Sequence, residues 1–213
     1  MVEQNKEAQF TTVDEVGQHF KDNYPKPEES GAFYDKMSGQ GYDDFVKKID
    51  FNQPENVTKC IGKGQVVDLD PETAEILDIG AGTGTVGLYL KEKGFKNITG
   101  IDASRSLLDK LDQSGAYKES RCMYLGQGVD KFPDDLKGKF DITTCTGCWI
   151  IGHIPAVGME DCHAALKVGG YMVNGTRSMY WEKGEKEGYR DKVDEMIADG
   201  KFELIHQYEW THG

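Results

Sequence analysis

The residues with the clearest chemical meaning lie at positions 75–87, where the sequence reads E-I-L-D-I-G-A-G-T-G-T-V-G. A short apolar run that contains Asp78 leads into glycines at 80, 82, 84 and 87, and a helical pattern follows. Because glycine has no Cβ, this backbone can turn sharply and lie close to a ligand. A second apolar run, 98–101, ends at Asp102. Strand, glycine turn, helix, strand and acid together indicate a nucleoside-cofactor site.

Two kinds of nucleoside cofactor fit this pattern. The spacing Gly82-x-Gly84-x-x-Gly87 matches a dinucleotide fingerprint, so a nicotinamide-dependent dehydrogenase is one alternative. Asp78 argues against it, because a carboxylate beside the ligand repels a pyrophosphate and attracts the ammonium group of an amino acid.

Later segments favour the second kind of cofactor. Phe140-Asp141-Ile142 and the run L-K-V-G-G at 166–170 resemble the later motifs of the class I S-adenosylmethionine-dependent methyltransferases, an F-D-hydrophobic strand and an L-K-P-G-G turn. The resemblance covers roughly residues 30–210. It implies S-adenosylmethionine as cofactor and a Rossmann-like α/β fold: a mostly parallel, doubly wound sheet with helices on both faces and an N-terminal helical lid.

Composition narrows the class of partner. The 213 residues are 38% hydrophobic and carry a formal net charge of −12, with no basic run, which disfavours a nucleic-acid partner. The start of the chain lacks the apolar core of a signal peptide, and no stretch of about 20 apolar residues could span a bilayer. Five cysteines without a framework spacing indicate reduced thiols. We therefore expect a cytoplasmic enzyme without membrane or nucleic-acid partners.

The order of elements predicts one domain, 1–213, with residues 1–73 as a helical cap or lid and 74–213 as the cofactor-binding core. In the first part we expect three short helices, near 13–20, 45–49 and 57–61, and a lid or linker at 24–42. From residue 75 the pattern alternates, which is typical of a parallel sheet. The expected order is strand 75–79, helix 84–93, strand 97–102, helix 104–113, strands 121–125 and 140–146, helix 156–166, strand 170–176, helix 185–199 and strand 202–210.

The ends of the strands give the expected cofactor contacts. Asp102 is the expected acceptor for both ribose hydroxyls, with a helix N-cap as its structural alternative. Asp78 is expected to order the ammonium group through the backbone or water, and Gln127 and Gly128 to bind adenine where relatives carry an acid. Trp149 is expected to stack on adenine, with core packing as the alternative. The other expected cofactor contacts are the glycine-turn residues Gly80, Ala81, Gly82 and Gly84, together with Ala103 and Thr146.

The lid and the later loops give the expected catalytic and acceptor contacts. Tyr34-Asp35 and Tyr42-Asp43 are similar to a Y-D-x-x-A-x-x-Y-D signature of small-molecule methyltransferases, so both tyrosines are expected at the cofactor. With 125–127 and 170–177, these pairs make the chain look most like the methyltransferase-like proteins of the Williams–Beuren syndrome region. His153 is the candidate catalytic residue, with bracing of its loop as the alternative. The candidate acceptor contacts are Tyr180, Trp181, His206 and Tyr208, for which core packing is the alternative.

Cysteine spacing raises one further alternative. Cys145-x-x-Cys148 with Cys162-His163 resembles a zinc-ligand pattern, but the two pairs fall on a strand and on a helix of another face. We therefore expect no metal.

The sequence predicts transfer of a methyl group to O, N or S of a small-molecule acceptor. A dehydrogenase and a non-catalytic S-adenosylmethionine-binding regulatory module remain as alternatives, and the acceptor and the oligomeric state stay open.

Overall fold

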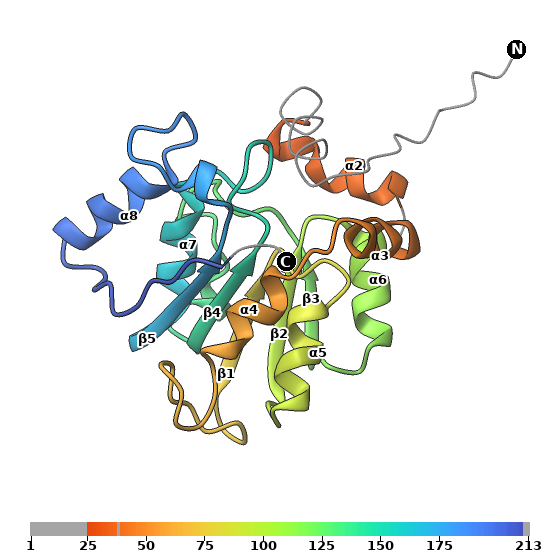
Figure 1. Ribbon diagram of the computed structural model, residues 1–213, viewed down its shortest axis with the longest axis horizontal. Coiled ribbons are helices and arrows are strands. Elements are labelled where there is room, and N and C mark those ends of the chain that lie inside the picture. Colours follow the sequence, from red (N-terminus) through yellow and green to blue (C-terminus); the bar gives the residue numbers. More distant parts are fainter. Residues whose placement is uncertain (1–24, 38, 211–213) are drawn as a thin grey trace, which may run out of the picture.

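The computed structural model describes residues 25–37 and 39–210, arranged around one central sheet (Figure 1). Its five strands are all parallel and lie in the order β3-β2-β1-β4-β5. Their bounds are β1 (Glu75–Ile79), β2 (Asn97–Asp102), β3 (Glu119–Cys122), β4 (Phe140–Thr146) and β5 (Leu166–Gly175). The order reverses direction between β1 and β4, which is where ligands bind in open sheets of this kind.

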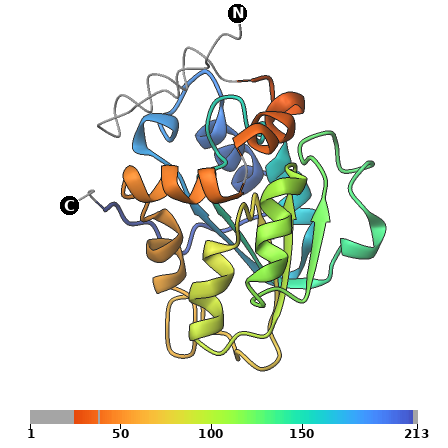
Figure 2. The ribbon, with the colours of Figure 1, turned by 90° about the vertical axis from the view of Figure 1, so that its right-hand side faces the viewer.

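Helices cover both faces of the sheet. One face carries α4 (Gln53–Lys59), α5 (Thr85–Glu92) and α6 (Arg105–Gln113), as Figure 2 shows, and the other carries α7 (Gly158–Ala165) and α8 (Tyr189–Ala198). Each face has its own apolar core: Ile76, Leu90 and Ile98 are fully buried on the first, and Leu77 and Phe140 on the second. The Rossmann-like, doubly wound α/β fold is therefore confirmed.

The lid region is more regular than the sequence predicts. Residues 24–42 were expected to be a lid or linker, and their described part contains the short 3-10 helix η1 (Pro27–Glu29), α2 (Ser30–Met37) and the start of α3 (Gly39–Lys48). Glycine makes the close packing of α2 possible, because a Cβ at Gly31 would lie 2.3 Å from the Ala103 carbonyl oxygen. The helix expected near 13–20 lies outside the described residues.

The prediction of a strand at 202–210 is wrong. This segment runs on from α8 without strand pairing, and Leu204 and Ile205 remain 52% and 57% exposed. Side chains hold it instead, because the Tyr208 hydroxyl donates to the Asn56 carbonyl and the Trp210 indole donates to the Asn52 side chain, both on or beside α4. Among the described residues, β5 is therefore an edge strand.

Smaller differences concern element ends. The third strand is 119–122 rather than 121–125, and β5 begins at Leu166, so the L-K-V-G-G run belongs to the strand where a turn was expected. The described chain also contains two short 3-10 helices, η2 (Asp134–Leu136) and η3 (Ser178–Tyr180).

Candidate cofactor-binding and catalytic site

A narrow cleft opens where the carboxyl ends of β1, β2 and β4 meet the N-terminal helices. Its free volume is about 70 Å³. It is lined by backbone of the glycine turn, by the ends of three strands, by the loop after β4 and by side chains of α2 and α3: Pro27, Ser30, Tyr34, Tyr42, Gly80, Gly82, Ile101, Asp102, Ala103, Leu107, Met123, Tyr124, Leu125, Thr146, Gly147, Cys148, His153 and Ile154.

The glycine turn forms the floor of this cleft. Gly80 and Gly82 have φ angles of 64° and 55°, which glycine adopts without strain. The Ala81 amide donates to the Ile101 carbonyl at 2.9 Å, so the turn is tied to the end of β2. Of the expected turn residues, Gly80 and Gly82 face the cleft. Ala81 instead packs in a small apolar cluster, and Gly84 caps α5.

Asp102 joins the glycine turn to the start of α6. Its Oδ2 accepts from the Gly82 amide at 2.9 Å, and its Oδ1 accepts from the Ser104 amide at 2.8 Å. Burial raises its pKa, although these backbone hydrogen bonds act in the opposite direction. The N-cap itself is Ser104, whose hydroxyl accepts from the Leu107 amide. Asp102 therefore lines the cleft as the sequence predicts, and it also holds the backbone in place.

Asp78 lies beneath the glycine turn and does not line the cleft. It is 1% exposed, its Oδ2 accepts from the Tyr117 hydroxyl at 2.6 Å, and its Oδ1 accepts from the Thr144 hydroxyl at 2.8 Å. The Tyr117 oxygen in turn accepts from the Gly87 amide at 2.9 Å, in the first turn of α5. Burial raises the Asp78 pKa to about 7. Asp78 therefore supports the turn from beneath, and its ordering of the ammonium group through the backbone or water stays a prediction.

Tyr34 and His153 meet across the cleft. The Tyr34 hydroxyl lies 2.7 Å from His153 Nε2, and their rings stack edge to face at 5.5 Å. His153 Nδ1 lies 3.2 Å from the Ile151 carbonyl oxygen, which can only accept, so Nδ1 carries the proton and Nε2 accepts from Tyr34. Burial lowers the His153 pKa to about 4, so the imidazole is neutral at pH 7.

In each Tyr-Asp pair, the tyrosine and the aspartate make different contacts. Tyr34 and Tyr42 face the cleft, pack edge to face at 5.7 Å, and the Tyr42 ring covers Gly82. Asp35 accepts from the Ser104 hydroxyl at 2.6 Å and from the Ser106 amide at 3.0 Å, and Asp43 forms an ion pair with Lys110. The tyrosines were expected at the site. The aspartates, which clamp α2 and α3 onto α6, were missed.

An apolar part of the cleft wall is formed by Leu107, Met123, Leu125 and Ile154. Sequence reasoning missed these side chains, although Met123 and Leu125 follow directly on the third strand. The neighbouring Gly126 amide donates to Asp161 of α7 at 2.7 Å, which fixes the loop from behind. Gln127 and Gly128, expected at the adenine, are outside the lining.

Several expected contacts lie elsewhere. Trp149 is fully buried in the core against Tyr189, which agrees with its structural alternative. Tyr180 is 4% exposed in the same core, and Trp181 stacks under the Arg190 guanidinium. His206 and Tyr208 belong to the C-terminal segment beside α4. None of these five described side chains lines the cleft.

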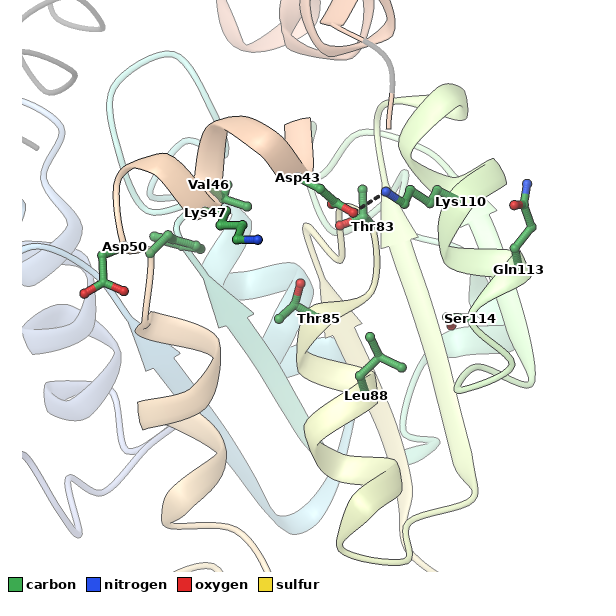
Figure 3. Close-up of a pocket in the computed structure, with 11 residues that line it drawn as sticks. Asp43, Val46, Lys47, Asp50, Thr83, Thr85, Leu88, Lys110, Gln113 and Ser114 are labelled. Carbon is green, nitrogen blue, oxygen red and sulfur yellow. Dashed lines mark hydrogen bonds and ion pairs between the residues drawn. The ribbon is translucent and has the colours of Figure 1, made fainter. Parts of the chain in front are cut away.

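A larger hollow of about 490 Å³ lies behind the glycine turn, between α3, α5 and α6 (Figure 3). The side chains of Asp43, Val46, Lys47 and Asp50 line it at helical spacing, and Tyr42 on the same helix faces the cofactor cleft. Helix α3 therefore separates the two spaces, and Thr83 of the glycine turn contributes to the hollow and not to the cleft.

The cleft residues fit S-adenosylmethionine better than a dinucleotide. Among the described residues, Asp102 is the one acidic side chain in the lining, no lysine or arginine lines it, and His153 is neutral. A pyrophosphate finds no cation to pair with in this described lining, whereas a cofactor with a positive sulfonium meets aromatic faces and a carboxylate. Within the described part of the chain, no group of three potential ligand side chains could hold a metal ion, and no helix is long and apolar enough to cross a membrane.

Comparison with known proteins agrees with this geometry. Residues 76–170 match the family model of a methyltransferase domain. The chain is 28% identical to human methyltransferase-like protein 27 over 185 residues, which cover 85% of this chain and 73% of that protein. It is also 28% identical over 122 residues to a ubiquinone biosynthesis O-methyltransferase from Alkalilimnicola ehrlichii, over 56% of this chain and 45% of that one.

Solved structures show the same fold. A TehB-like S-adenosylmethionine-dependent methyltransferase from Corynebacterium glutamicum superposes with a TM-score of 0.52 at 18% identity, covering 74% of this chain and 81% of that one. A possible histamine N-methyltransferase from Thermotoga maritima gives 0.51 at 18% identity, covering 82% and 81%. The glycine turn, the acid after β2 and the domain match lead to one conclusion: the chain is a class I S-adenosylmethionine-dependent methyltransferase.

Proposed function

We propose that this methyltransferase acts on a small molecule and methylates a protic O, N or S atom, with Tyr34 and His153 accepting the proton. The observation that carries the proposal is the 2.7 Å contact between the Tyr34 hydroxyl and His153 Nε2 at the wall of the cleft. S-adenosylmethionine supplies an electrophilic methyl group, so the protein has mainly to position the acceptor and remove its proton.

The proton path runs through atoms of this chain. The acceptor passes its proton to the Tyr34 oxygen while the Tyr34 proton moves to His153 Nε2. The imidazolium that forms keeps its Nδ1–H donated to the Ile151 carbonyl, 3.2 Å away. Since His153 has a pKa of about 4 before the reaction, it is in the basic form throughout the physiological range.

The remaining contacts follow from the lining. We assign the ribose hydroxyls to Asp102, the space beside Gly80, Gly82, Ala103 and Thr146 to the rest of the cofactor, and the apolar wall of Met123, Leu125 and Ile154 to the adenine ring. A cleft with aromatic and apolar walls and few charges suits a small, partly apolar acceptor. The net charge of −12 argues against a nucleic-acid acceptor, and the free thiols favour the cytoplasm.

The N-terminal part, 1–73, acts in this proposal as a lid on the core, 74–213. The cleft holds about 70 Å³, whereas sites for small molecules usually hold about 300 Å³ or more. Because Tyr34 and Tyr42 close one side of it, α2 and α3 have to move outward for the cofactor to enter.

A turnover assay tests the proposal. The purified protein is incubated with S-adenosylmethionine and a panel of phenols, amines and thiols, and S-adenosylhomocysteine is quantified. We expect turnover with one class, a 10²-fold or greater loss in kcat for His153→Gln, and a smaller loss for Tyr34→Phe. The matched control is His163→Gln, since His163 packs on Phe202 of the C-terminal segment.

The pH dependence of kcat/KM distinguishes a catalytic His153 from one that only braces its loop. With a basic His153 of pKa about 4, the acid limb of kcat/KM lies well below pH 6. An acid limb near 6.5 would contradict the assignment. Cofactor binding without turnover across the panel would instead indicate a regulatory binding module.

A further inference from the structure

Two cysteines lie on either side of the chain turn that follows β4, beside the cofactor cleft. Cys145 belongs to β4 and is 1% exposed, and Cys148 follows three residues later, half-buried, among the residues that line the cleft. Between them Gly147 has a φ of 70°, which turns the chain sharply after the strand. All five cysteines of the chain are free thiols.

The two thiols belong to one apolar cluster. Cys145 is buried in the cluster that includes Leu77 and Ile79, and Cys148 packs against it. Cys148 is also among the groups that raise the pKa of Cys145, so the two side chains lie near each other. The Cys148 sulfur also lies directly over Gly80: a Cβ at Gly80 would come within 2.1 Å of it, and the thiol is 3.7 Å from the Gly80 carbonyl oxygen. The position of one sulfur is therefore linked to both the partner thiol and the glycine turn.

The other cysteines do not combine these properties. Cys162 is buried and its thiol donates to the Gly158 carbonyl at 3.2 Å within α7. Cys60 donates to Val57 at the end of α4, and the exposed Cys122 donates to Ala103. Among the described cysteines, Cys148 is the one that lines the cleft.

We propose that Cys145 and Cys148 are an oxidisable dithiol, that a small disulfide such as glutathione disulfide converts them to an intramolecular disulfide, and that this modification lowers the affinity of the cleft for its cofactor. The chemistry requires a redox partner of that class and does not depend on which acceptor is methylated.

The reaction balances in two exchange steps. The Cys148 thiolate attacks glutathione disulfide, forms a mixed disulfide and releases one glutathione thiolate. The Cys145 thiolate then attacks the Cys148 sulfur and releases the second glutathione. Two protein thiols are oxidised, one disulfide is reduced to two thiols, and the protons pass to the two glutathiones. Burial holds the Cys145 pKa well above its ordinary value, so the second step should accelerate as the pH rises.

Disulfide formation has to move the wall of the cleft. The two sulfurs must approach to about 2 Å, which draws the Cys148 sulfur away from its place over Gly80. The backbone of Gly147 and Cys148 moves with it, and both residues line the cofactor cleft. Because interiors are close-packed, a shift of this size at the turn is expected to weaken binding by at least tenfold.

Oxidation of the dithiol and binding of the ligand affect each other by the same factor, because the two equilibria are thermodynamically linked. If the dithiol form binds the ligand tenfold more tightly than the disulfide form, saturating ligand stabilises the dithiol by the same factor. The midpoint potential of the pair then rises by about 30 mV, the value that corresponds to a factor of ten for two electrons.

The test uses the full chain in glutathione redox buffers, with S-adenosylhomocysteine as the probe ligand. Peptide mapping without reductant is expected to show a Cys145–Cys148 cross-link, and calorimetry a tenfold or greater loss of affinity that dithiothreitol reverses. Cys148→Ala should keep one affinity under both conditions. Cys145→Ala should stop at a single glutathionyl group on Cys148, and Cys60→Ser serves as the matched control that behaves as the parent chain does.

Three results overturn the proposal. The first is the absence of a cross-link at oxidising poise, the second is a cross-link between Cys145 and Cys162, and the third is a Cys145–Cys148 cross-linked protein that binds S-adenosylhomocysteine with unchanged affinity. If Cys148→Ala fails to fold, the midpoint potential of the dithiol in the parent chain is measured with and without S-adenosylhomocysteine. A difference below about 10 mV contradicts the coupling between ligand binding and dithiol oxidation.

Discussion

Asp78 makes the stability of this fold depend on pH in a direction opposite to that of most carboxylates. Its pKa is raised from 3.8 to about 7 by burial, in spite of the hydrogen bonds from Tyr117 and Thr144. Between these two pH values the folded chain holds a proton that the unfolded chain has released. The contribution of this residue to stability is therefore complete below pH 3.8 and is lost as the pH rises to about 7.

The magnitude follows from the same shift. A rise from 3.8 to about 7 corresponds to about 4 kcal/mol, with a slope of about 1.4 kcal/mol per pH unit. Asp78→Asn has no such titration. Its amide can accept from one of the two hydroxyls, and loss of the other hydrogen bond costs about 1 kcal/mol at any pH.

Urea unfolding of both chains at several pH values between 4 and 8 measures the difference. We expect the parent chain to be the more stable one near pH 4 and Asp78→Asn to be the more stable one near pH 8. The other titrating groups are common to both chains, so the difference isolates Asp78. A difference in unfolding free energy that stays constant within about 0.5 kcal/mol across this range would refute the reasoning. Should Asp78→Asn not fold, a carboxyl NMR titration of Asp78 gives the pKa directly.

Three further predictions concern the turn, the ribose contact and the lid. Gly80→Ala places a Cβ 2.1 Å from the Cys148 sulfur at a φ of 64°, so it should lower the melting temperature, and the double variant with Cys148→Ala should recover part of that loss. Asp102→Ala should weaken S-adenosylhomocysteine binding by about 2–3 kcal/mol. It should also destabilise the fold, because the Gly82 and Ser104 amides lose their hydrogen-bond acceptor. Calorimetry and thermal unfolding measure the two effects, and unchanged affinity would refute the contact between Asp102 and the ribose. Hydrogen exchange should show that S-adenosylhomocysteine protects α2 and α3 more than α8, and equal protection in both states would mean a fixed cap.

The sheet could be predicted because its signals are local. Each of β1, β2 and β4 is a short segment with Ile, Leu, Phe or Thr that ends at an acid or is followed by a glycine, and the alternation with helical patterns leaves few arrangements. The segment 202–210 shows where such reasoning fails: its alternating F-E-L-I-H-Q-Y-E-W has strand character, but the side chains of Tyr208 and Trp210 find partners on or beside α4. Propensity does not reveal a competing tertiary contact.

The site was predicted best where a backbone requirement fixes the residue type. Gly80, Gly82 and Asp102 lie at the cleft because a turn and its acceptor are needed at that point. Asp78 was expected to act through the backbone or water, and it lies buried beneath the turn. Trp149 was expected to stack on adenine, with core packing as the alternative, and it lies in the core. The depth of a side chain depends on which face of its strand or loop is covered by helices. Tyr117, whose hydroxyl donates to Asp78, is 39 residues away in sequence, so local sequence does not reveal this contact.

The way α2 and α3 are attached is consistent with the proposal that they form a moving lid. Described apolar side chains of α2 and α3 are all at least partly exposed, and the buried positions there are Ser30, Gly31 and Gly39. Their attachment is polar, through Asp35 at the start of α6 and the Asp43–Lys110 ion pair, and such a partly exposed pair contributes about 1 kcal/mol or less. An element held in this way opens at a small fraction of the global unfolding free energy. Because the same two helices carry Tyr34 and Tyr42, opening them in the proposed mechanism would also remove the hydroxyl that His153 accepts from, so we expect access to the cleft and assembly of the proposed proton path to be one event.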